Sequence, residues 1–357
     1  MQHPRLQHGA QVLDEVATDL SQVAREVFSE AREYVDSATG RRVKLEGTPL
    51  GRQLEKARTQ PLPATIRKKT GTGEGCLRCG TAKPSKAPAC PVCGEPFSLV
   101  QTSGGLLFKA AILSDQGRVR ANNEDEVRLW TEPGGLSCIG LVADGMGGEK
   151  AGEVASRTAA EAIARFLNQN VLTARRSIHP DVQLPLALSQ ALQAANSAVY
   201  NLANHNPALG QMGTTTTLAL AWKDRAYLGH VGDSRAYLVA PHGAIWQITH
   251  DHSLVASLAT FGQISAAEAE QHPQRNLLYR CVGQKSNVNV DTYTRRLAQG
   301  DRLVLCSDGL TRHVDQAEIA TLVINQAAPE IACLELARLA NSRGGEDNIS
   351  IIIIQAS

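Results

Sequence analysis

The chain has 357 residues, of which 43% are hydrophobic and 20% charged, and its formal net charge is +1. These are the proportions of an ordinary globular protein, and so small a net charge gives no argument for binding nucleic acid or a membrane surface. No apolar run approaches the roughly 18 residues that a membrane span requires. The first residues also lack the apolar core of a signal peptide, so a cytoplasmic location is expected by default.

Residues 1–40 have the spacing of an amphipathic helix, which is predicted to run to about Asp36. Apolar side chains recur there at alternating steps of three and four residues, as one helix face requires. They are Leu13, Val16, Leu20, Val23, Val27 and Tyr34. We expect this helix to pack on the rest of the protein. A short coiled coil or a docking helix for a partner is the alternative, but the repeat is short for a coiled coil.

Residues 41–75 have the composition of a linker. They contain nine lysines and arginines but only three glutamates, together with prolines and a glycine-rich run. Such a segment is predicted to be a solvated tether. Contact of its basic residues with an acidic partner or with nucleic acid is the alternative.

Residues 76–100 carry four cysteines in two closely spaced pairs. The pairs are Cys76-Leu-Arg-Cys79 and Cys90-Pro-Val-Cys93. Each Cys-x-x-Cys turn directs two thiolates at one ion, and two such turns complete a tetrahedral four-sulfur site. Because cysteines would occupy all four coordination positions of the ion, we expect one structural zinc in a zinc ribbon. We favour a module for protein contact or domain spacing over nucleic-acid binding.

Residues 105–357 repeat one arrangement, in which an apolar strand ends at an acidic residue. Residues 139–143 lead into Asp144 and three glycines within four positions, and residues 303–306 lead into Ser307-Asp308-Gly309. Further acidic residues beside strands are Glu124, Asp125, Asp233 and Asp347. One such turn alone carries little information, because Asp and Gly favour turns. Five in one domain indicate a shared site, and all-oxygen ligands select Mg²⁺ or Mn²⁺ over zinc.

The same region alternates between short strands and longer helices. Strands are predicted at residues 126–130, 139–143, 214–222, 226–231, 235–240, 245–248, 303–306 and 349–354. Helices are predicted at residues 151–168, 186–204, 317–326 and 330–341, with residues 253–273 helical and then irregular. This order predicts an α+β fold in which two antiparallel sheets pack together with helices outside.

As an ordered set, the motifs of this region resemble the metal-dependent Ser/Thr protein phosphatase family (PPM, type 2C) in its bacterial form. The matching stretches are Arg120…Glu124-Asp125, Asp144-Gly-Met-Gly-Gly, Gly213-Thr-Thr, Gly232-Asp-Ser-Arg, Ser307-Asp-Gly and Asp347-Asn348. The resemblance implies the same sandwich, with residues 253–273 as a variable flap beside the active site. It also implies hydrolysis of phosphoserine and phosphothreonine in proteins by water that a centre of two or three metal ions activates.

The resemblance implies metal ligands at five of these positions. Asp144 is expected to bridge two ions. Asp308 and Asp347 are expected to hold one of them. Glu124 and the carbonyl oxygen of Gly145 are expected to hold the other, largely through water.

Three further positions are implied to complete the site. Asp125 is expected to orient a water on the metal, and Asp233 is expected to bind a third ion together with Asp308. Arg120 is expected to grip the substrate phosphate, because a guanidinium group can donate two parallel hydrogen bonds to it.

Met146 departs from the pattern of many eukaryotic members, which have a histidine there that is proposed as the general acid. Methionine cannot donate a proton, so the leaving group must be protonated from elsewhere. His250, His252 and His272 lie in or near the flap. For each of them we favour a surface or hydrogen-bonding role over catalysis.

The expected partners are phosphorylated proteins, with a counteracting Ser/Thr kinase, and neither a membrane nor nucleic acid. The alternative function is a catalytically weak phosphatase-like module that acts mainly in protein binding through the zinc ribbon. We disfavour it because no acidic position is missing. The sequence separates a third activity, hydrolysis of small phosphoesters, only poorly from the first.

Overall fold

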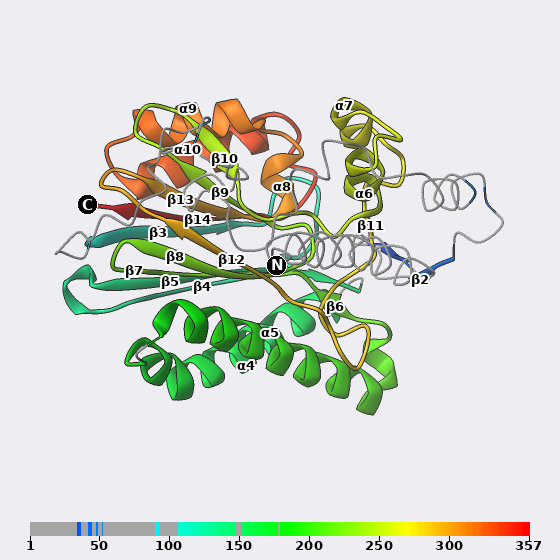
Figure 1. Cartoon of the computed structure of the whole chain (residues 1–357). Coiled ribbons are helices and arrows are strands. Elements are labelled where there is room, and N and C mark those ends of the chain that lie inside the picture. The colour runs from blue at the N-terminus through cyan, green and yellow to red at the C-terminus, as the bar shows by residue number, and fades with distance from the viewer. Residues whose placement is uncertain are drawn as a thin grey trace, which may run out of the picture.

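The computed structural model describes residues 34–36, 42–44, 48, 52, 90, 92, 106–147, 151–177 and 179–357. Two antiparallel sheets pack face to face, with helices on both outer sides (Figure 1). The strand order is β10-β9-β13-β14-β3 in one sheet and β12-β8-β7-β5-β4 in the other. The predicted α+β sandwich is therefore confirmed.

Most strands of the two sheets lie close to their predicted positions, but strands β3 and β12 were not predicted. The first sheet contains β3 (Phe108–Asp115), β9 (Arg235–Val239), β10 (Ile245–Gln247), β13 (Arg302–Cys306) and β14 (Ile349–Ala356). The second contains β4 (Asp125–Thr131), β5 (Ser137–Met146), β7 (Thr216–Trp222), β8 (Arg225–Val231) and β12 (Asp291–Arg296), with the short β6 (Gly213–Thr214) paired to β5. Single 3-10 turns are found at η1 (Pro133–Gly135) and η2 (Pro207–Leu209).

Strand β14 shows why the central strands are almost wholly apolar. Ile351 and Ile353 pack in the cluster beneath the helices, whereas Ile352 and Ile354 pack between the sheets. Successive side chains of a strand point to opposite faces. A strand that is covered on both faces must therefore be apolar at every position.

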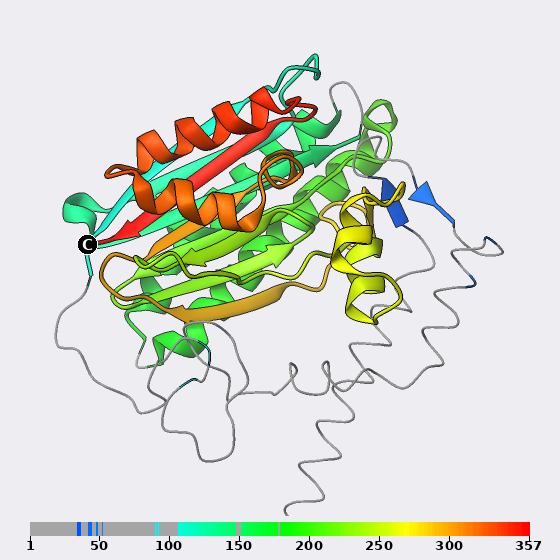
Figure 2. The same cartoon turned by 90° about the horizontal axis from the view of Figure 1, so that it is seen from above.

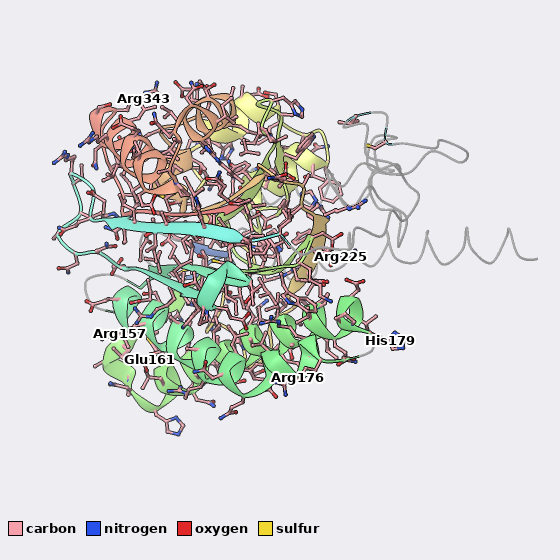
Figure 3. The ribbon with its side chains drawn as sticks, turned by 90° about the vertical axis from the view of Figure 1, so that its left-hand side faces the viewer. Arg157, Glu161, Arg176, His179, Arg225 and Arg343 are labelled. Atoms are coloured by element: carbon pink, nitrogen blue, oxygen red, sulfur yellow. The ribbon has the colours of Figure 1, made fainter. Side chains whose placement is uncertain are left out.

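Two long helices cover each sheet. α4 (Ala151–Arg175) and α5 (Pro180–His205) lie on the second sheet, and α9 (Gln316–Asn325) and α10 (Pro329–Ser342) lie on the first (Figure 1). The side chains of Arg157 and Glu161 project outward from α4, and Arg343 does so beyond α10 (Figure 3). Both helical layers are thus amphipathic, as the sequence predicts. None of the helices in the described part of the chain is long and apolar enough to cross a membrane.

The predicted flap forms two short helices at one end of the sandwich. α6 (Leu254–Thr260) is capped by the Ser253 hydroxyl, and α7 (Ala266–Glu270) begins with a capping box of Ser265 and Glu268. β11 (Leu277–Leu278) follows them. The single turn α8 (Asp308–Thr311) lies at the same end of the sandwich (Figure 1).

The prediction for the end of the N-terminal helix was wrong. Tyr34–Asp36 forms strand β1, which pairs antiparallel with β11 through Val35–Leu278 and Asp36–Leu277. β2 (Arg42–Val43), within the predicted linker, pairs with the other edge of β1. A tyrosine at the last helical step fits a strand equally well, and the partner strand, far away in the sequence, decides between the two.

The rest of the predicted helix and linker lies outside the described residues, except for Lys44, Thr48 and Arg52. Of the four cysteines of the predicted zinc ribbon, only Cys90 is described, and it is buried. The ribbon therefore stays a prediction from the cysteine spacing.

Candidate metal centre

Two neighbouring strands of the second sheet bring the first pair of carboxylates together. Asp125 begins β4, and it lies directly opposite Asp144 of β5 in the antiparallel ladder. Directly opposed residues place their side chains on the same face of a sheet. Asp144 is also held by Thr215, which lies between β6 and β7, because its N–H donates to Thr215 Oγ1 at 3.0 Å and its carbonyl accepts from the Thr215 N–H at 2.8 Å.

Asp308 and Asp347 come from two loops of the first sheet that meet at Gly309. A Cβ atom at Gly309 would lie 2.1 Å from the Asn348 carbonyl oxygen and 3.3 Å from Asp347 Cβ, so only glycine permits this approach. The Ser307 hydroxyl donates to Asp125 Oδ2 at 2.8 Å. This bond ties the acidic residues of the two sheets together.

Glu124 is 8% exposed and is held mainly through its backbone. Its N–H donates to Asn348 Oδ1 at 2.8 Å, and its carbonyl accepts from the Ser156 hydroxyl at 2.6 Å. The glycine loop after Asp144 packs closely on it. A Cβ atom at Gly145 would lie 2.2 Å from the Gly152 carbonyl oxygen, and one at Gly152 would lie 2.8 Å from Glu124 Cδ.

Asp233 lies between β8 and β9 and is 7% exposed. The hydroxyl of the next residue, Ser234, shares a 2.7 Å hydrogen bond with Thr215 Oγ1, the group that also holds Asp144. The structure thus joins all the predicted acidic positions into one network of loops.

The carboxyl groups of this network raise one another's pKa. The pKa values of Asp125, Asp144, Asp233 and Asp347 all lie above the ordinary value, first because the groups are buried and then because neighbouring carboxylates repel the charged form. Asp308 contributes to the repulsion in all four cases. Burial also raises the pKa of Glu124. Buried carboxylates that repel one another require cations to stay ionised.

The residues present fit divalent cations. Glu124 Oε1 and Asp308 Oδ1 are buried without a hydrogen-bond partner in the described part of the chain. A buried, unpaired carboxylate oxygen is costly, and a hard cation that accepts oxygen ligands would offset that cost. The acidic group thus offers oxygen atoms of the kind that Mg²⁺ and Mn²⁺ prefer.

Two arginines lie on these carboxylates. Arg120 Nη2 donates to Asp347 Oδ2 at 2.9 Å. Arg312 donates to Asp308 Oδ2 through Nε at 3.0 Å and through Nη2, and its Nη1 lies 3.4 Å from Asp347 Oδ2. With these side-chain positions, no three acidic, histidine or cysteine groups among the described residues are gathered closely enough to hold an ion by themselves.

A known protein family matches most of the region that forms the sandwich. The model of the protein phosphatase 2C family matches residues 116–338, which is more than half of the chain. The chain belongs to the protein phosphatase 2C family. It is 34% identical over 248 residues to the serine/threonine phosphatase of Listeria monocytogenes, a match that spans 69% of this chain and 95% of that relative.

Solved structures of phosphatases have the same fold. The serine/threonine phosphatase Stp1 from Staphylococcus aureus is 33% identical with a TM-score of 0.65, over 73% of this chain and 99% of that one. The catalytic domain of PstP in complex with two manganese ions is 33% identical with a TM-score of 0.60, over 70% of this chain and 99% of that one. The prediction of a metal-dependent protein serine/threonine phosphatase is confirmed.

The three histidines in or near the flap, His250, His252 and His272, make structural contacts in this phosphatase. His252 is 1% exposed, accepts the Gly232 N–H through Nδ1 at 2.9 Å, and lies 3.1 Å from Asp291 Oδ2 through Nε2. The ring of His250 packs edge-on against Tyr293, and His272 Nδ1 accepts a backbone N–H at 3.2 Å. These contacts fit the surface or hydrogen-bonding role that the sequence favours for each of them.

Sequence reasoning missed Arg312 in this phosphatase. The signal was present, because Arg312 follows Asp308 by four residues, the spacing at which opposite charges meet on a helix. Although burial acts to lower the pKa of Arg312, the carboxylates of Asp308 and Asp347 raise it. The guanidinium group therefore stays charged among the acidic residues.

Proposed function

We propose that the phosphatase hydrolyses its phosphoprotein substrates at the acidic network, with Asp144 bridging two divalent ions. Asp308 and Asp347 would hold one ion, and Glu124 and the Gly145 carbonyl oxygen the other. The observation that carries this proposal is that acidic residues from separate loops converge here, while Glu124 Oε1 and Asp308 Oδ1 are buried without a hydrogen-bond partner in the described part of the chain. Two ions bound there would polarise the phosphoryl group and lower the pKa of water, so that water can attack at neutral pH.

Asp125 is proposed to orient the attacking water. Its Oδ2 accepts a hydrogen bond from the Ser307 hydroxyl at 2.8 Å, which fixes the carboxylate in place. Burial raises the pKa of Asp125 to about 8, although the hydroxyls of Ser350 and Ser307 act to lower it. Cations bound nearby would favour the ionised form of this group, which can accept a hydrogen bond from water.

Arg120 is proposed to bind the substrate phosphate. Its side chain is 29% exposed and lies at the open edge of the acidic network, where Nη2 bonds to Asp347. The phosphate of a substrate would take up the remaining N–H groups of the fork, which match phosphate oxygens in geometry and charge.

Asp233 is proposed to hold a third ion together with Asp308. After burial, the charge of Asp308 is the largest cause of the raised pKa of Asp233, and a cation bound between the two carboxylates would relieve this repulsion. Fewer carboxylates act on Asp233 than on Asp144, and we expect the third ion to be the most weakly bound.

The four-cysteine zinc ribbon at Cys76, Cys79, Cys90 and Cys93 is also a proposal, and its support is the spacing of the cysteines. Elemental analysis of reduced, dialysed protein should find about one zinc per chain, since four thiolates hold zinc far more tightly than carboxylates hold Mg²⁺. Protein without zinc would refute the ribbon.

A cytoplasmic place in signalling, opposite a Ser/Thr kinase, is a further proposal. It is supported by four buried cysteines that form no disulfide, Cys138, Cys281, Cys306 and Cys333, which suit a reducing compartment.

The decisive experiment measures phosphate release from phosphothreonine and phosphoserine peptides. Activity should disappear after chelation and return with Mn²⁺. Asp144→Asn should stay inactive at every Mn²⁺ concentration, whereas the control Glu161→Gln, on the outer face of α4 (Figure 3), should match the wild type. Full activity of folded Asp144→Asn would overturn the proposal.

A further inference from the structure

Strand β1 comes from a part of the chain outside the family match, yet it lies against the flap. The match begins at residue 116, whereas β1 spans Tyr34–Asp36. β1 forms a three-stranded sheet with β11 and β2, and the two blue strands stand beside the yellow flap helices in both views (Figures 1 and 2).

Tyr34 fills the inner side of the flap. Its side chain is 1% exposed, and it belongs to a buried cluster with Leu254 and Leu258 of α6, Leu277 of β11 and Tyr279. Phe261 and Ile264, which connect α6 to α7, pack against the same cluster. Short helices such as these depend on tertiary contacts for their stability, so Tyr34 is part of the interior that holds the flap in place.

Val35 faces the opposite side and packs against Met146. This residue belongs to the segment that begins at Asp144 (residues 144–147), which we call the metal loop. Val35 is 7% exposed and clusters with Met146, Leu278 and Cys281. Met146 comes two residues after Asp144 at the end of β5. Because adjacent side chains of a strand point to opposite faces, one step along β1 joins the flap to the metal loop.

Arg42 of β2 ties the same sheet to the base of the site. Its Nη2 donates to the Gln284 carbonyl at 3.0 Å. Gln284 Nε2 in turn donates to the carbonyls of Gln211 and Met212 at 2.6 and 3.2 Å. The next residue, Gly213, pairs with Met146 across β6 and β5. The N-terminal sheet is therefore attached on both sides of the metal loop.

We propose that β1 positions the flap over the metal centre, and that the affinity for phosphoprotein substrates depends on it. Tyr34 and Val35 act as positioning residues that need not touch the substrate. The inference rests on the proposed function only in assuming that phosphoproteins bind beside the flap. Loss of β1 contacts should weaken substrate binding while the metal ligands, which are fixed by the sandwich, keep their places.

The test compares Tyr34→Ala and the milder Tyr34→Leu with the wild type, all as the full chain. Val182→Asp, at a position that is 64% exposed on α5, serves as a surface control. Hydrogen exchange of the flap amides should be about tenfold faster in Tyr34→Ala, as expected for a locally loosened segment. KM for a phosphothreonine peptide should rise, whereas kcat for a small aryl phosphate and Mn²⁺ affinity should stay near the wild-type values. Tyr34→Phe should restore both flap protection and KM.

The two proposals can fail separately. If wild-type protein does not hydrolyse phosphopeptides, the proposed function fails, but flap exchange still tests the contact of β1. If folded Tyr34→Ala and Tyr34→Leu keep wild-type flap exchange and wild-type KM, the positioning role of β1 is overturned. A uniform loss of kcat on both substrates would also overturn it, because β1 would then support the centre and not substrate binding.

Discussion

The metal centre and the flap lie side by side but are held by different forces. At the centre, each carboxylate lies within or directly beside a strand of a rigid sandwich, and hydrogen bonds such as Ser307 to Asp125 help to fix these residues. The flap consists of two short helices and a two-residue strand, whose apolar side chains depend on Tyr34 from a remote segment. The centre is therefore sensitive to charge, and the flap to packing. Variants in one region should leave the other intact.

The largest effect is expected from Asp308→Asn. The change keeps the shape of Asp308 but removes the charge that acts on the four other aspartates of the centre. Mn²⁺ affinity should fall, and turnover should fall by more than about 100-fold, beyond the usual effect of changing a residue that only supports a ligand. Calorimetric titration with Mn²⁺ and phosphopeptide kinetics measure both. Hydrogen exchange of the flap should not change, and near-normal turnover of the folded variant would contradict the ligand assignment of the whole acidic group.

A smaller effect is expected from Asp233→Asn. If Asp233 holds only the most weakly bound ion, two tight ions should remain in a titration while the weakest binding event disappears. Turnover should drop by about tenfold, the lower end for losses at a metal site. The alternative is that Asp233 only stabilises its turn. In that case the variant would lose some thermal stability but keep all its metal-binding events and its rate per folded molecule.

Arg312→Gln should change metal binding in the opposite direction. The guanidinium group now neutralises Asp308 and Asp347 and competes with an ion for their oxygens. Its removal should make Mn²⁺ binding severalfold tighter, and the melting temperature of chelated protein should fall, because buried carboxylates lose a partner. Weaker Mn²⁺ binding in the folded variant would instead show that Arg312 organises the ligands. Arg338→Gln, in an exposed ion pair on α10, is the matched control.

The smallest effect concerns pH: we expect the amount by which Mn²⁺ stabilises the folded protein to depend on pH. A carboxyl group whose pKa is higher in the folded than in the unfolded chain holds extra protons when folded, so stability falls as pH rises between its two pKa values. For Asp125 that window runs from 3.8 to about 8. Bound cations offset this loss, so Mn²⁺ should raise the melting temperature by more at about pH 8 than at about pH 5.5. An equal rise at both values would show that repulsion within the acidic group is weak.

The sandwich and its acidic network could be predicted from the sequence because both leave local signals. Strand β14 shows its two-sided burial as a run of isoleucines, and Asp144 and Asp308 each follow an apolar strand and precede glycine. In these places local preference and final environment agree, which is the condition under which pattern reasoning succeeds.

The N-terminal strand could not be predicted because its partners are distant in the sequence. Tyr34 fits a helical repeat in the sequence. In the structure it pairs with Val43 of β2 and packs on Leu254 and Leu277. Arg312 was overlooked for a different reason. The spacing of four residues from Asp308 was a local signal, but the contact with Asp347 forms only in the folded chain.

The packing of Gly152 bears on how members of this family lose activity. A methyl group there would lie 2.8 Å from the Glu124 carboxylate and 2.9 Å from the Gly145 carbonyl carbon, so one of these two proposed ligands would have to move. A single added carbon atom could thus silence the enzyme while every acidic residue stays in the sequence. The presence of all the acidic residues is therefore not enough to identify an active phosphatase. The small residues that pack against those carboxylates must be present as well.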